Sequence, residues 1–275
     1  MAVEFAYHAN CWGPLGGNAV GVTSISELTY VTFGDMERAI ADIGRAGYTG
    51  IEMFDGNLLA YVGRVADLKR SLSAAQLKLV AAYSGGNFIF DDVLGEELAR
   101  IERAASIAAE LGAEHLVVGG GAKRFSGIER GDMGKLAAAL DKVVAIARKM
   151  GLRAHYHPHL STIVEGPESV REIFGRTAID FCPDTAHLAA AGGDPAALVS
   201  ELSGRISYVH LKGLQRQPFT FTPLDTGDLD NGKVIEALQA ASFSGWITAE
   251  LDAWSDPFDG AVRSLKFMKT RFGQK

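Results

Sequence analysis

The sequence predicts a single (β/α)8 barrel, and three observations support this fold class. The length of 275 residues suits one α/β barrel, which takes roughly 250 residues. Short β-branched or aromatic runs alternate with amphipathic helical segments without a break in composition, as in parallel sheets joined by helices. Helical segments end in glycine just before the next strand, as at Gly47, Gly112 and Gly151. We therefore expect residues 1–275 to form one TIM-barrel domain.

Eight runs are predicted to be the barrel strands. In chain order they are Glu4–Cys11, Gly50–Phe54, Lys78–Tyr83, His115–Val118, Leu152–His157, Ile179–Phe181, Ile206–Leu211 and Trp246–Leu251. Apolar residues at helical spacing predict helices between them. Examples are Met36–Ala46, Leu94–Leu111, Met133–Met150 and Gly232–Ala241. A doubly wound open sheet is the structural alternative, but Gly13–Gly17 lacks the G-x-G-x-x-G spacing of its phosphate loop and is interpreted as an active-site loop.

Composition excludes several classes of protein. A hydrophobic content of 47% excludes a disordered chain, and 27 basic against 33 acidic residues, a formal charge of −6, argue against a nucleic-acid partner. Cys11 and Cys182 lie in apolar stretches and are expected to be buried thiols, not a disulfide scaffold. The absence of a signal-peptide pattern and of a bilayer-spanning apolar run predicts a soluble, cytoplasmic protein without a membrane partner.

In such a barrel, chemistry is expected at the carboxyl ends of the strands, and polar residues concentrate there. Period-two alternation places His155, His157 and His159 on one face of the fifth strand, with Glu165 one short loop beyond. One such histidine would usually be structural, but three beside a carboxylate favour a site. For Glu165, the alternative is an acid at a helix N-terminus.

The next three strands also end in polar residues. Asp184 and His187 follow the sixth strand, His210 and Lys212 share a face of the seventh, and Glu250 ends the eighth. Asp184 could instead be a helix cap, and His210 or Lys212 alone could be structural. Together they predict a site for Mn²⁺, Co²⁺, Fe²⁺, Zn²⁺ or, more weakly, Mg²⁺.

At these residues the chain resembles the xylose-isomerase-like TIM-barrel superfamily of sugar isomerases, epimerases and inosose dehydratases. The resemblance extends from Gly47–Glu52 to Gly245–Glu250, and its most specific parts are His157-Pro158-His159 and Cys182–His187. It implies one divalent metal ion, most simply Mn²⁺, and a homo-oligomer, either a dimer or a tetramer. It also implies an enzyme of carbohydrate metabolism.

The resemblance further implies roles for single residues. The metal ligands would be Asp184, His210 and Glu250, with Glu165 as the fourth and His157 or His155 as substitutes. His187 matches a substrate-contacting histidine, and Arg216 matches an arginine of ketose 3-epimerases. We add His155, His159, Glu52 and Trp12 as candidate substrate residues, Glu52 also as a support for the ligands.

The resulting hypothesis is an enzyme that removes a proton next to the carbonyl of a keto-sugar, inosose or related polyol. An enediolate-type intermediate would then lead to isomerisation, epimerisation or dehydration. Glu250 and His157 are the candidate base and acid, and Lys212 is expected to orient the substrate. The alternatives are a non-catalytic barrel that binds a sugar or metal and a DNA-repair nuclease like endonuclease IV. The nuclease is disfavoured because the histidines needed for three zinc ions are missing.

Overall fold

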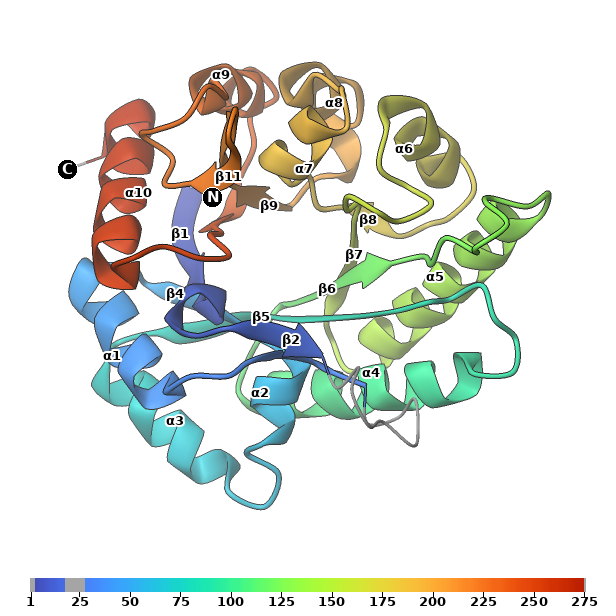
Figure 1. Ribbon diagram of the computed structural model, residues 1–275. Helices are drawn as coiled ribbons and strands as arrows, with labels where there is room; N and C mark the ends of the chain where they lie inside the picture. Colours follow the sequence, from blue (N-terminus) through green and yellow to red (C-terminus); the bar gives the residue numbers. More distant parts are fainter. Residues whose placement is uncertain (1–2, 18–27, 275) are drawn as a thin grey trace.

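The computed structural model describes residues 3–17 and 28–274 and confirms the barrel (Figure 1). Eight parallel strands form one sheet in the order β8-β7-β6-β5-β4-β1-β12-β9. The strands are β1 (Val3–His8), β4 (Gly50–Phe54), β5 (Lys78–Gly86), β6 (His115–Gly120), β7 (Arg153–His157), β8 (Asp180–Phe181), β9 (Tyr208–Leu211) and β12 (Gly245–Ala249).

The barrel closes between β8 and β9 just beyond the short strand β8. There Asp184 forms an isolated parallel bridge with His210, whose amide donates to the carbonyl of Pro183 at 2.9 Å. The closure therefore places two of the predicted metal ligands side by side.

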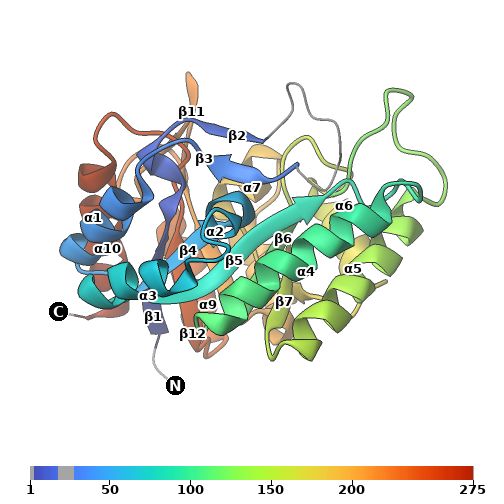
Figure 2. The same ribbon diagram turned by 90° about the horizontal axis from the view of Figure 1, so that it is seen from below.

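Helices cover the outside of the barrel and follow its strands in turn (Figures 1 and 2). They are α1 (Met36–Ala46), α3 (Val65–Ala74), α4 (Leu94–Glu110), α5 (Asp132–Lys149), α6 (Pro167–Phe174), α8 (Pro195–Glu201), α9 (Asn231–Ala240) and α10 (Pro257–Phe272). The four predicted helices are confirmed to within one residue at each end. Gly47 ends α1 in the left-handed conformation, with φ 98°, as the glycine signal predicts.

Short helices and hairpins lie at the carboxyl ends of the strands. They are the helices α2 (Asp55–Leu59) and α7 (Thr185–Ala190), the hairpin of β2 (Leu15–Gly17) with β3 (Tyr30–Thr32), and the hairpin of β10 (Gly213–Arg216) with β11 (Phe219–Thr222). The described residues also include the 3₁₀ turns η1 (Ala9–Trp12) and η3 (Ser203–Arg205). The first strand is thus shorter than predicted, because the chain turns after His8.

Side chains alternate between the two faces of each strand, which gives an apolar layer outside the barrel sheet and another inside it. One face of each strand packs against the helices, and the other fills the barrel with small and aromatic side chains. Gly50 lies in this interior, where a Cβ would stand 2.6 Å from the Trp246 ring and 2.8 Å from Val80. In residues 3–17 and 28–274, the helices lack the combination of length and apolarity needed to cross a membrane.

Candidate metal centre and active site

Four ligand-type side chains converge at the carboxyl end of the barrel. His157 ends β7, Asp184 follows β8, His210 lies in β9, and Glu250 follows β12. All four are buried, and each offers one ligand atom within 4.8 Å of the others. His157 Nε2 lies 3.5 Å from Asp184 Oδ2, and His210 Nδ1 lies 2.6 Å from Glu250 Oε2. We call these four residues the metal group.

The facing atoms of the metal group fit a metal ion. Among the described residues, His157 Nε2, Asp184 Oδ2, His210 Nδ1 and Glu250 Oε2 are buried and make no well-aligned hydrogen bond, and their nearest polar neighbours are one another. Buried polar atoms are seldom left in this state, so four of them facing one another indicate a shared cation. Two imidazoles and two carboxylates suit Mn²⁺, Fe²⁺, Co²⁺ or Zn²⁺.

Glu52 supports His210 from inside the barrel. Its Oε2 lies 2.8 Å from His210 Nε2 and also accepts a hydrogen bond from the Tyr208 hydroxyl, which in turn accepts one from Thr248 at 2.6 Å. Burial opposes charge on His210, but Glu52 and Glu250 raise its pKa to about 10. A carboxylate on the far nitrogen of a histidine ligand orients the ring toward the metal.

Lys212 supports the carboxylates from the other side. Its side chain is 0% exposed, and its Nζ lies 2.9 Å from Glu250 Oε1 and 3.0 Å from Asp252 Oδ1. Asn10 donates to the same two oxygens at 3.3 and 3.1 Å. Burial opposes the ammonium charge, but the carboxylates of Asp252, Glu250 and Asp184 raise the pKa of Lys212 above its usual value. Lys212 therefore stays a fixed positive charge beside the metal group.

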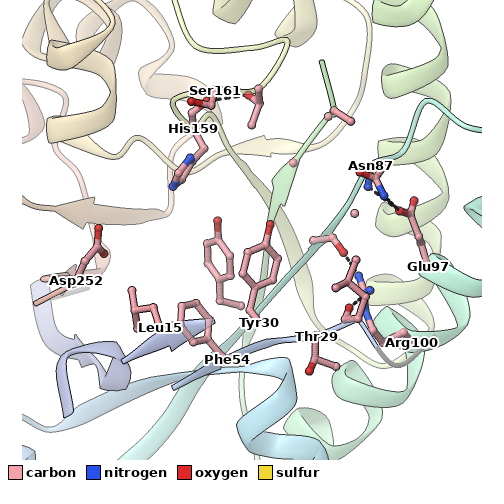
Figure 3. Close-up of a pocket in the computed structure, with 18 of the residues that line it drawn as sticks. Leu15, Thr29, Tyr30, Phe54, Asn87, Glu97, Arg100, His159, Ser161 and Asp252 are labelled. Atoms are coloured by element: carbon pink, nitrogen blue, oxygen red, sulfur yellow. Dashed lines mark hydrogen bonds between the residues drawn. The ribbon is translucent and has the colours of Figure 1, made fainter. Parts of the chain in front are cut away.

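A cavity of about 570 Å³ opens beside the metal group (Figure 3). Glu250, Asp252 and His159 line one end. The remaining wall is made of aromatic, aliphatic and polar side chains and of glycines, and its residues include Leu15, Leu28, Tyr30, Phe54, Tyr83, Gly85, Gly86, Asn87, Glu97, Arg100, Gly120 and Gly121. This size and mixed lining are typical of a small-molecule site.

The His159 ring extends into this cavity (Figure 3). Its Nδ1 lies 2.7 Å from the carbonyl oxygen of Leu160, which can only accept, so Nδ1 carries the proton and Nε2 is the acceptor. The ring lies against His187, with 3.8 Å between centroids. Burial lowers the pKa of His159, which keeps the ring neutral and able to accept a proton.

Comparison with known families identifies the barrel. Residues 40–271 match the family model described as xylose isomerase-like TIM barrel. The chain belongs to this family. The inosose dehydratase of Clostridium beijerinckii is 24% identical over 272 residues, covering 86% of this chain and 90% of that protein.

Solved structures show the same barrel. The D-allulose 3-epimerase of Methylomonas sp., in complex with D-allulose, matches with a TM-score of 0.75 and 20% identity over 98% of this chain and 97% of that one. The probable 3-DHS dehydratase AsbF of Bacillus anthracis matches with a TM-score of 0.75 and 12% identity over 97% of this chain and 98% of that one. At these identities the matches support the fold alone.

The structure does not bring Glu165, the expected fourth ligand, into the metal group. Its Oε1 accepts from Lys123 Nζ at 2.6 Å and its Oε2 accepts from the Ser161 amide at 2.7 Å, on the rim of the barrel. His157, one of the two stated substitutes, stands in the group instead. The reason is position, because His157 is still in the strand while Glu165 lies beyond the turn that follows it.

Of the six expected substrate residues, only His159 lines the cavity, and Glu52 instead lies inside the barrel against His210. His155 points into the barrel but one pleat deeper, where its Nε2 lies 2.9 Å from His115 Nδ1. Trp12 turns toward α1 and donates to Asp42 at 3.0 Å. Arg216, half exposed on β10, pairs with Asp228. By contrast, His187 lies close to the site, with Nε2 3.4 Å from Lys212 Nζ.

Several site residues were missed from the sequence. Asn10 could have been found, because it follows His8 by two residues at the end of the first strand. Tyr83 likewise ends the third predicted strand. Tyr30 carried no such signal, since only the β2–β3 hairpin brings it over the barrel mouth.

Proposed function

We propose that this protein is a divalent-metal-dependent enzyme that removes the proton next to the carbonyl of a keto-sugar, inosose or related polyol. The product would arise through an enediolate-type intermediate by isomerisation, epimerisation or dehydration. One observation carries the proposal, namely four buried ligand atoms without well-aligned hydrogen bonds at the edge of a cavity of about 570 Å³. The names of the relatives, inosose dehydratase and D-allulose 3-epimerase, support the substrate class.

The metal ion, most simply Mn²⁺, would be held by His157, Asp184, His210 and Glu250. When bound, it would polarise the substrate carbonyl and so acidify the neighbouring C–H group. Glu52 would hold the His210 ring, and Lys212 would hold Glu250 by its second oxygen.

Proton transfer is assigned to Glu250 and His159. Both line the cavity, and His159 offers a neutral Nε2 that can accept a proton. His157 is the acid expected from the sequence, but its side chain is 1% exposed and faces Asp184 and Glu250. We therefore give His157 to the metal. Lys212, 0% exposed, acts through Glu250 instead of touching the substrate.

The aromatic wall would bind the less polar face of the substrate. Tyr30 and Phe54 stack with 5.7 Å between centroids, and Tyr83 meets both edge-on. Aromatic faces of this kind exclude water from one side of a polyol while the polar end of the cavity holds its hydroxyl groups.

The test is solvent exchange. The protein is incubated with Mn²⁺ and a panel of ketoses and inososes in deuterium oxide, and deuterium incorporation and new products are followed by NMR. We expect exchange at the carbon next to the carbonyl with at least one substrate, and no exchange with a Glu250→Gln variant. Metal binding without exchange for any keto-polyol would instead favour a non-catalytic sugar- or metal-binding barrel.

A further inference from the structure

The Lys212 ammonium lies in a second group of ligand-type atoms beside the metal group. Its Nζ is 2.9 Å from Glu250 Oε1, 3.0 Å from Asp252 Oδ1, 3.4 Å from His187 Nε2 and 3.6 Å from Asp184 Oδ2. Three carboxylates and one imidazole are donors that divalent transition metals accept.

Two carboxylates belong to both groups. Glu250 turns Oε2 toward His210 and Oε1 toward Lys212. Asp184 Oδ2 lies 3.5 Å from His157 Nε2 and 3.6 Å from Lys212 Nζ. Each group then has two members of its own. They are His157 and His210 for the metal group, and His187 and Asp252 for the lysine.

This arrangement matches a two-metal centre in which one cation is a lysine. Two-metal sites hold their ions about 3.5–4 Å apart, a spacing that shared carboxylates can bridge. We propose that Lys212 takes the place of a second divalent cation, so that the protein binds one metal ion where the same ligands without lysine would bind two. The inference rests on the proposed function in one respect, which is that the metal group binds one metal ion.

The surroundings of Lys212 keep the ammonium in this position. The side chain is 0% exposed, and the Phe221 ring of β11 covers Nζ at 4.6 Å from its centroid. Asn10 holds the facing oxygens of Glu250 and Asp252. Shortening the lysine would leave the buried carboxylates of Asp184 and Glu250, and the partly exposed Asp252, without its charge, and a buried unpaired charge is costly. A divalent ion would offset that cost.

Metal stoichiometry tests the inference. The purified protein is dialysed against Mn²⁺, and bound metal is counted by inductively coupled plasma mass spectrometry. We expect one equivalent for the wild type and two for Lys212→Ala. Electron paramagnetic resonance should show isolated Mn²⁺ in the wild type and a spin-coupled pair in the variant. The double variant Lys212→Ala/Asp252→Asn should return to one equivalent.

Lys123→Ala is the matched control. It also removes a lysine from a carboxylate, since Lys123 Nζ lies 2.6 Å from Glu165, but this pair is on the rim. It should bind one equivalent. If circular dichroism shows that Lys212→Ala is unfolded, Lys212→Asn, whose amide supplies an oxygen ligand, takes its place with the same expectation.

The outcomes separate the two proposals. A wild type that binds no metal overturns the proposed function. A wild type with one equivalent and folded lysine variants that also hold one overturn only the role of Lys212. A spin-coupled pair in the wild type overturns that role as well, because the lysine would then not replace the second ion.

Discussion

Histidines lie at two levels inside the barrel, and their partners differ between the two levels. Near the amino end, His155 and His115 lie 2.9 Å apart and pack against the Tyr208 ring. One pleat higher on the same strand, His157 faces carboxylates and has no hydrogen-bond partner for Nε2 among the residues described. The two levels therefore differ in the partners that they offer to a histidine on this strand.

The physical cause is what each level offers to an imidazole. At the lower level, burial lowers the pKa of His115 to about 4 and that of His155 well below its ordinary value, so both rings stay neutral. At the upper level, Glu52 and Glu250 lie beside His210 and raise its pKa to about 10, while burial still lowers the pKa values of His159 and His187. The carboxylates that stabilise positive charge on His210 would also stabilise a metal ion at the same level.

The largest expected effect comes from removing a charge at the upper level. Asp184→Asn should lower Mn²⁺ affinity by more than about 100-fold, because losing even an indirect support of a ligand costs 10–100-fold. Asn keeps the cap that Asp184 gives to α7 by accepting from the His187 amide at 2.9 Å. Isothermal titration calorimetry measures the affinity.

Asp194→Asn is the control for Asp184→Asn. Asp194 caps α8 in the same way, away from the metal group, and its variant should bind Mn²⁺ like the wild type. Equal affinity for the wild type and Asp184→Asn would show that the upper level is not a metal site.

The second largest effect is expected for Glu52, which connects the two levels. Glu52 joins Tyr208 below to His210 above, so Glu52→Gln should lower Mn²⁺ affinity about 10–100-fold while the barrel stays folded. Glu97→Gln tests another buried carboxylate, which accepts from the amides of Asn87 and Phe88 and has no contact with the metal group among the interactions of the described residues. Its Mn²⁺ affinity should not change. A fall of the same size in both variants would mean that the loss is structural.

A third test concerns the mouth above the upper level. Gly120 has φ 122°, and a Cβ there would stand 2.0 Å from the Gly86 carbonyl oxygen. Gly120→Ala should therefore lower the free energy of unfolding by about 1–3 kcal/mol in urea titrations. Gly134→Ala, in α5 with open space around it, should not destabilise the protein. If Gly120→Ala leaves the free energy of unfolding unchanged, the backbone around Gly86 can move to accept the methyl group.

The last test concerns the lower level, where the expected effect is a change in how stability depends on pH. Between pH 6.5 and about 4, the unfolded chain protonates His115 but the folded chain does not, so stability falls as pH falls. His115→Gln removes this site and should reduce the slope by up to about 1.4 kcal/mol per pH unit. Urea unfolding at pH 4 to 7 measures it. An unchanged slope would mean that His115 is protonated in the folded protein.

Much of the site was predictable because strand ends are local features of the sequence. Asp184, His210 and Glu250 each stop a recognisable strand, and parallel strands bring their carboxyl ends together. The choice between His157 and Glu165 was not predictable. It depends on how the turn after β7 is held, and the contacts of Glu165 with Lys123 and Ser161 are not encoded by spacing.

By itself, the sequence determined the barrel, its order of strands and the set of residue types at its mouth. These follow from periodicity, from glycine at helix ends and from the rule that parallel strands point one way. The tertiary structure alone decided the level of each histidine, the burial of Lys212 among carboxylates and the position of Tyr30 over the cavity. These depend on strand stagger and loop packing, which join residues far apart in the chain.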